Sequence, residues 1–259
     1  METQEKIKAN DIINLALELG KGMLKNGSEI ARVEESIVRV CTAYGLKKVD
    51  VFSITSMMLI SANDDQEQVY SQFRRVYSYT SNFDRLDKLN SFCRQVCLET
   101  PAIDEALVTL DEINKSGSKT SVMACVGSML ATSSFAMFFG GTFLDALATM
   151  PIAVFIFFMN KYIKKHGINR LFYTALSSII SGLIAVLFVA IGFGNNYSLI
   201  MIGDIMLMIP GLTLINSIRE MLCGDIMSGF MRLAESVLLS MAIAFGFALP
   251  ILLASKILV

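Results

Sequence analysis

The sequence predicts an α-helical polytopic membrane protein, with about five transmembrane helices after an N-terminal cytosolic α+β domain. Charge is concentrated in residues 1–120, which hold 15 of the 22 Lys and Arg and 18 of the 23 Asp and Glu. Residues 171–194 form a long apolar run without charge. As a helix it is about 36 Å long, enough to cross a hydrocarbon core of about 30 Å. We therefore expect a cytosolic domain over 1–118 and a transmembrane domain over 119–259.

The cytosolic domain is predicted to open with two helices. Apolar residues at helical spacing predict a helix over 10–26, and Gly27 is placed to end it. Ser28 has the side chain of an N-cap for a second helix over 29–44, which Gly45 closes.

A small sheet and two further helices complete this domain. Apolar and alternating runs predict strands over 48–55, 57–62 and 69–77. Asn82 or Asp84 caps the next helix, and Pro101 lies in the first turn of another over 102–114. The polar stretch 115–119 is the expected linker. These elements amount to an α+β domain with one core.

Five apolar segments predict the membrane spans. They cover about 121–139, 143–159, 171–194, 198–215 and 233–255. The segment between the second and third spans carries Lys161, Lys164, Lys165 and Arg170. Because cytoplasmic loops are enriched in Lys and Arg, we expect this segment and the N-terminus inside and the C-terminus outside.

Several function classes are disfavoured by composition. The net charge of −1 and the lack of Trp argue against nucleic-acid binding. A single histidine, His166, leaves neither a Cys/His zinc set nor a Ser–His arrangement for catalysis, so we expect no metal, cofactor or catalytic residue. A phosphate-binding loop of the Walker type is also missing, which argues against ATP as the driving force.

Three acids in or near the predicted spans are candidate transport residues: Asp145, Asp204 and Glu235. A charge in mid-membrane costs at least about 2.5–3.5 kcal/mol, so such groups usually face a cavity or a partner. Asp204 is predicted to be the deepest. The structural alternatives are that Asp145 touches lipid headgroups and that Glu235 forms an ion pair with Arg232, three residues earlier.

The fourth predicted span is interrupted by Pro210 and Gly211. Proline removes a backbone donor, and in lipid the freed carbonyl needs a new partner, such as an ion, water or substrate. A Pro/Gly-interrupted span that carries an acid is the best sequence indicator of a transport site, although a kink repaired by Ser or Thr is the alternative. Arg219 lies in the amphipathic stretch 216–232, where it could meet a substrate carboxylate or reach a lipid phosphate.

Four short motifs in this order resemble the threonine/serine exporter (ThrE) family. Residues 27–37 resemble its G-x-x-x-x-R-x-E signature, in which Arg32, Glu34 and Glu35 cluster; from spacing alone these residues would form a solvated, ion-paired face. The other resemblances are an FGG-x-x-x-D turn over 140–145, a Pro-Gly span over 209–211 and a glycine-punctuated segment over 224–232 that precedes Glu235.

This resemblance implies a function that composition does not show. It implies the first half of a bacterial inner-membrane exporter, paired with a second small membrane protein as a homo- or hetero-oligomer. The implied substrates are small hydrophilic metabolites, either threonine and serine or dicarboxylates such as succinate, with export driven by the proton-motive force. It also gives weight to Arg32, Glu34, Asp145, Asp204 and Pro210. The alternative is a membrane-anchored enzyme or scaffold that acts through its cytosolic domain.

Overall fold

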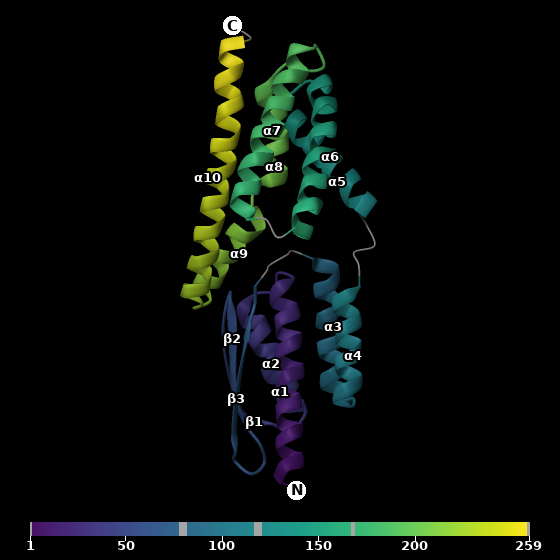
Figure 1. Cartoon of the computed structure of the whole chain (residues 1–259), viewed down its shortest axis with the longest axis vertical. Coiled ribbons are helices and arrows are strands. Elements are labelled where there is room, and N and C mark those ends of the chain that lie inside the picture. The colour runs from purple at the N-terminus through teal and green to yellow at the C-terminus, as the bar shows by residue number, and fades with distance from the viewer. Residues whose placement is uncertain (1, 78–81, 117–120, 167–168, 258–259) are drawn as a thin grey trace. The chain divides into compact units, whose positions relative to one another are not determined.

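The computed structural model describes residues 2–77, 82–116, 121–166 and 169–257 (Figure 1). The chain forms two compact units. An α+β unit comprises Met1–Lys119 together with Asn216–Arg232, and a helical unit comprises Thr120–Ile215 together with Leu233–Val259. Each unit is described by itself. The predicted linker falls partly on 117–119, outside the described residues.

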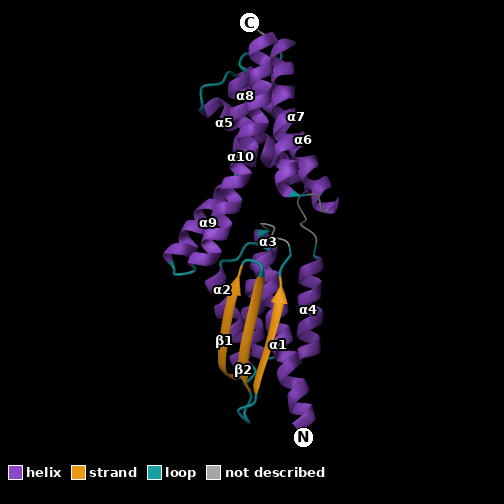
Figure 2. Ribbon diagram, turned by 60° about the vertical axis from the view of Figure 1, so that its left-hand side comes forward, coloured by secondary structure: helices purple, strands orange, loops and turns teal. Residues whose placement is uncertain are grey.

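The α+β unit places two helices against one face of a three-stranded sheet. Its elements are α1 (Glu2–Lys25), α2 (Ile30–Ala43), β1 (Lys47–Ile54), β2 (Met57–Asn63), β3 (Val69–Arg75), α3 (Phe83–Glu99) and α4 (Ile103–Lys115). The strands are antiparallel in the order β1-β2-β3, as Figure 2 shows, and Phe52, Leu59 and Phe73 are paired in register across them. All three predicted strands are present, with ends within two residues of those expected.

The core of this unit lies between the helices and the sheet. The apolar stripe of α1 is fully buried, with Ile13 and Leu17 among its members, and Ile37 of α2 and Ile60 of β2 join the same cluster. Burial of such side chains stabilises the fold by about 1.5–3 kcal/mol each. The apolar stripe that predicts the first helix is therefore the surface on which the unit assembles.

Five local features were expected to mark helix boundaries in this unit, and three of them do. Pro101 does not lie in the first turn of α4, because the N-cap is Ala102 and the helix begins at Ile103. Gly27 and Gly45 have positive φ angles of 98° and 93°, the backbone that ends α1 and α2. Asn82 is the N-cap of α3, and its side chain accepts a hydrogen bond from Arg85 N at 3.1 Å. The prediction for Ser28 is wrong: the N-cap of α2 is Glu29, because the Ser28 amide still bonds to Met23 O and α2 begins one residue later than expected.

The helical unit contains the long apolar helices. Its elements are α5 (Ser121–Phe138), α6 (Phe143–His166), α7 (Arg170–Ala190), α8 (Tyr197–Met208), the start of α9 (Gly211–Leu222) and most of α10 (Ile226–Ile257). Among the described residues, α6, α7 and α10 are each long and apolar enough to cross a membrane, and α8 with α9 makes a fourth candidate bent by 47°. The fifth expected span, α5, is apolar but shorter.

Two features of these helices differ from the prediction. The helix of the second predicted span runs past residue 159, because α6 continues to His166 and carries the expected loop residue Lys161 within the helix. The amphipathic stretch 216–232 forms not one helix but a hairpin, which we call the α9–α10 hairpin. It consists of the end of α9, a turn at Gly224 with a φ angle of 105°, and the start of α10. This hairpin belongs to the α+β unit.

Candidate functional site

Asp204 is one of two fully buried carboxylates in the helical unit. It lies in the middle of α8 with no exposed surface, and neither of its oxygens accepts a hydrogen bond from any described residue. A buried carboxylate that keeps its charge without a partner is far costlier than a buried amide or hydroxyl, so a proton, a cation or a polar solute must accompany it. Of the predicted transport residues, Asp204 is thus the one that the fold leaves unsatisfied.

The neighbours of α8 determine the direction in which Asp204 points. A Cβ on Gly203 would lie 2.7 Å from Thr132 O of α5 and 3.1 Å from Thr149 Cγ2 of α6, so this face of α8 packs closely on both helices. Met208, one turn beyond Asp204, has its Sδ 3.8 Å from Ser178 Oγ of α7. At 100° per residue, Asp204 lies between these two faces and therefore points toward α6 and α7.

The break between α8 and α9 lies one to two turns from Asp204. Helix α8 ends at Met208, and Gly211 N donates to Ile209 O at 2.9 Å. Because Pro210 has no N–H, it cannot bond Met206 O as the next residue of a continuous helix would. The structure thus places the interruption where the sequence predicts it, next to the buried acid.

Asp145 has a different environment, although it is equally buried. Its Oδ2 accepts from Thr142 N at 2.9 Å and from Thr142 Oγ1 at 2.8 Å, and its Oδ1 accepts from Asn195 N at 2.7 Å and Asn196 N at 2.9 Å. The carboxylate therefore caps the start of α6 and ties it to the turn between α7 and α8. Four donors leave it little capacity to bind a solute.

Glu235 and Arg219 form ion pairs that sequence spacing does not indicate. Glu235 does not pair with Arg232; its Oε1 lies 3.2 Å from Arg170 Nη1 at the start of α7. Arg219, in the α9–α10 hairpin, pairs with Glu29 at the start of α2. Both partners of each pair lie within one unit, and Arg219 is engaged in the fold of the α+β unit.

The three motif residues of α2 lie in three different environments. Arg32 is exposed, and its carbonyl accepts from Ser36 Oγ. Glu35 pairs with Arg39 at 2.6 Å instead of with Arg32.

Glu34 is half-buried, and its Oε1 accepts from Ser53 N of β1 at 2.6 Å. Burial raises the pKa of the Glu34 carboxyl, and the negative charge of Asp225 in the α9–α10 hairpin adds to this, while the Ser53 amide opposes it. Among the motif residues, Glu34 is thus the one that bonds α2 to the sheet and whose pKa responds to the charge of Asp225 in the hairpin.

A line of hydroxyl groups on α7 was not identified from the sequence. Tyr173, Ser177 and Ser181 are buried, and none of their hydroxyls has a hydrogen-bond partner among the described residues. Their spacing of four residues is visible in the sequence, but Ser and Thr are common in spans, so only burial separates these three from the rest.

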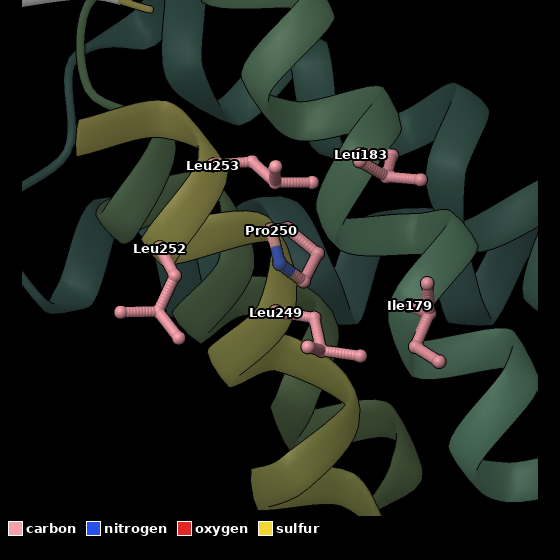
Figure 3. A pocket seen from close by; sticks show the side chains of 6 residues that line it. All are labelled: Ile179, Leu183, Leu249, Pro250, Leu252 and Leu253. Atoms are coloured by element: carbon pink, nitrogen blue, oxygen red, sulfur yellow. The ribbon is translucent and has the colours of Figure 1, made fainter. Parts of the chain in front are cut away.

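A hollow in the helical unit is not a site for a polar solute. It has a volume of about 280 Å³ and lies between α7 and α10, as Figure 3 shows. All of its lining residues are apolar: Ile179, Leu183, Leu249, Pro250, Leu252 and Leu253. Such a lining fits hydrocarbon and offers no group that would orient a hydrophilic metabolite.

Comparison with known proteins identifies the family. The family model described as "Putative threonine/serine exporter" (ThrE) matches residues 14–253. The chain belongs to the threonine/serine exporter family. This is a family of transporters, not of enzymes, and the family predicted from the sequence is confirmed.

Two curated relatives share the family. The chain is 23% identical to the "Probable threonine/serine exporter" of Mycobacterium tuberculosis and 24% identical to the "Threonine/serine exporter" of Corynebacterium glutamicum. Both alignments cover 93% of this chain but only 46% and 50% of the relatives, so the chain spans about half of their length. No solved structure gives a significant match.

Proposed function

We propose that this chain is one half of a secondary exporter of small hydrophilic metabolites and that a second membrane protein of the same family completes the transport path. The alignments support this, because nearly the whole chain matches about half of each relative. The five spans expected from the sequence would also suit a two-half design, since a second half could then insert with the opposite orientation.

Asp204 is the observation that carries the transport proposal. It is fully buried on an interrupted apolar helix, and no described residue satisfies either oxygen. An ionisable group with these properties in a membrane segment is typical of substrate pathways and proton relays. The Asp145 carboxylate, by contrast, already accepts four hydrogen bonds. We therefore assign the transport role to Asp204 and a structural role to Asp145.

The chemistry of Asp204 favours one of the two substrate classes. A carboxylate attracts the ammonium group of an amino acid, and the relatives are named for threonine and serine. A dicarboxylate would be repelled by an ionised Asp204 and could approach only after this residue takes up a proton. We therefore propose amino acids with hydroxyl side chains as the first substrates to test, dicarboxylates as the second, and the proton gradient as the driving force.

The proposed location is the bacterial inner membrane with the N-terminus inside. Lys161 and Arg170 support this orientation, because they lie at adjacent ends of α6 and α7, and basic residues at the ends of spans favour the cytoplasmic side. The α+β unit would then lie in the cytoplasm.

Asp204→Asn tests the transport role. This variant keeps the size of the side chain but cannot carry a charge or exchange a proton. Together with the second half, it should export labelled threonine, serine or succinate from preloaded vesicles at least tenfold more slowly than the wild type. Asp204→Glu, which retains the carboxyl group, is the matched control. Export at the wild-type rate by Asp204→Asn, at equal amounts of folded protein, would remove Asp204 from the mechanism.

A further inference from the structure

Three hydroxyl groups of α7 form a regularly spaced row, which we call the hydroxyl line. It consists of Tyr173, Ser177 and Ser181, with exposed fractions of 5%, 0% and 0%. The Ser177 side chain lies beside the Tyr173 hydroxyl. None of the three hydroxyls is hydrogen-bonded to a described residue. Buried polar groups are rarely left in this state, so the line needs partners other than the residues that the structure describes.

Neighbouring hydroxyls on the same helix behave differently. Thr174 Oγ1 donates to Arg170 O, and Ser178 Oγ donates to Thr174 O, both at 2.8 Å. This bond to the preceding turn is the usual arrangement for Ser and Thr inside a helix. Ser177 and Ser181 do not make it, so their hydroxyls are directed away from the helix backbone. Thr174 and Ser178 thus provide matched internal controls.

The hydroxyl line faces away from α10. A Cβ on Gly182 would lie 2.7 Å from Pro250 Cγ, and a Cβ on Gly246 would lie 2.4 Å from Ser178 Cβ, so Ser178 and Gly182 mark the side of α7 that touches α10. At 100° per residue, Ser177 lies about 100° around the helix from Ser178. Because α7 also packs against α6 and α8, the buried hydroxyl line faces these two helices.

The end of the hydroxyl line lies at the level of Asp204. Helices α7 and α8 are joined by a short turn and run in opposite directions, with Ser178 beside Met208. One turn back along α8 is Asp204, and one turn forward along α7 is Ser181. Both side chains point toward the same junction of α6, α7 and α8. The line therefore leads from Tyr173, near the Arg170 end of α7, toward the unpartnered carboxylate.

We propose that the hydroxyl line is the route by which protons, carried by water, reach Asp204 from the Arg170 end of α7. This inference rests on the proposed function, in which Asp204 exchanges a proton. Ser177 and Ser181 are separated by about 6 Å along the helix, which is close to two hydrogen bonds of about 2.8 Å each, so one water molecule can bridge their hydroxyls. The Tyr173 hydroxyl already lies beside Ser177. Each hydroxyl both donates and accepts, as a proton relay requires.

Among the described residues, no charged or titratable group around this route is hydrogen-bonded to Asp204. On the helices packed against α8 these groups are Cys125, Asp145, Lys161, Tyr162, Lys164, Lys165, His166, Arg170 and Tyr173. The side chains of 163–168 are outside the described residues, and none of the described groups is hydrogen-bonded to Asp204. The carboxyl group therefore depends on the route for its proton.

Sided chemical labelling tests the route. Dicyclohexylcarbodiimide enters membranes and modifies protonated carboxyl groups, and intact-protein mass measures the product, with Asp204→Asn as the background. The full chain in membrane vesicles is held at different pH on the two sides. In the wild type, labelling of Asp204 should follow the pH on the Arg170 side. In the double variant Ser177→Ala with Ser181→Ala, its response to a pH jump on that side should be at least tenfold slower, and Tyr173→Phe should also slow it.

The matched control is Ser178→Ala, which removes a buried hydroxyl that is already bonded to Thr174 O and should label like the wild type. Unchanged labelling in the double variant would overturn the proposed route, as would labelling that follows the pH on the other side. Protection of Asp204 by sodium at constant pH would also overturn it, because the site would then bind a metal cation. If Asp204→Asn stops export while the double variant exports and labels normally, the proposed route is wrong and the proposed function stands. If Asp204→Asn exports at the wild-type rate, the proposed function itself is wrong.

Discussion

The buried ion pair between Arg232 and Glu220 should be the main electrostatic tie between the two arms of the α9–α10 hairpin. Arg232 Nη1 lies 2.9 Å from Glu220 Oε1, and the two side chains are only 10% and 3% exposed. Arg232 Nη2 also donates to Ser28 O at 3.4 Å, at the turn that precedes α2. Removing one member of such a pair leaves the other charge buried without compensation, which costs about 3–5 kcal/mol.

We therefore expect Arg232→Met to destabilise the α+β unit by about 3–5 kcal/mol, which corresponds to an increase of roughly two to three and a half orders of magnitude in its opening equilibrium. The double variant with Glu220→Gln should recover most of this loss, because no charge then remains buried. Cys41 provides the assay. It is fully buried, and burial raises the pKa of its thiol to about 12, so it reacts with alkylating agents only when the unit opens.

The alkylation rate of Cys41, measured by peptide mass in the full chain, gives the opening equilibrium for each variant. The exposed Cys223 serves as the control for reagent activity and should react alike in all of them. A change of less than threefold in Arg232→Met would refute the reasoning. Losses that simply add in the double variant would refute it as well, because they would mean that the two charges do not interact.

Two further predictions concern the other acids. Because the pKa of the Glu34 carboxyl is raised in the folded protein, folding favours its protonated form. Lowering the pH from 7 toward the ordinary pKa of a glutamate should therefore stabilise the wild type relative to Glu34→Gln. Raising the pH again should remove this gain. Thermal unfolding at several pH values measures the difference, and equal pH profiles would contradict it. Asp145→Ala leaves the Asn195 and Asn196 amides without an acceptor and should lower stability by about 3 kcal/mol or more, with export per folded molecule retained. Loss of export at unchanged melting temperature would instead place Asp145 in the transport path.

Local chemistry explains what the sequence predicted well. Gly27 and Gly45 end helices because they adopt the left-handed backbone conformation that glycine allows. Asn82 caps α3 through a hydrogen bond to the residue three positions later. The interruption at Pro210 follows from a missing N–H. In each case the physical cause lies within one helical turn of the residue, so a single stretch of sequence contains it.

The remaining features depend on residues that are far apart in the chain. Glu235 meets Arg170, 65 positions away, and Arg219 meets Glu29, 190 positions away. Spacing favoured Arg232 as the partner of Glu235, since three residues separate them, but the tertiary fold gives Arg232 to Glu220. The candidate site shows the same limit: the sequence indicated Asp204, whereas the role of Ser177 and Ser181 depends on which face of α7 is covered.

The path of α10 has a practical consequence for dissecting this protein. The helix runs unbroken from Ile226 to Ile257, yet its first seven residues pack with the α+β unit. A gene truncated after residue 119 would therefore encode a domain that lacks two contacts. These are the contact of Met231 with Thr55 after β1 and the ion pair of Arg219 with Glu29 at the start of α2. To produce the isolated domain, residues 216–232 should be fused to it through a flexible linker. If the simple truncation fails to fold, that result says nothing about whether the domain binds a ligand.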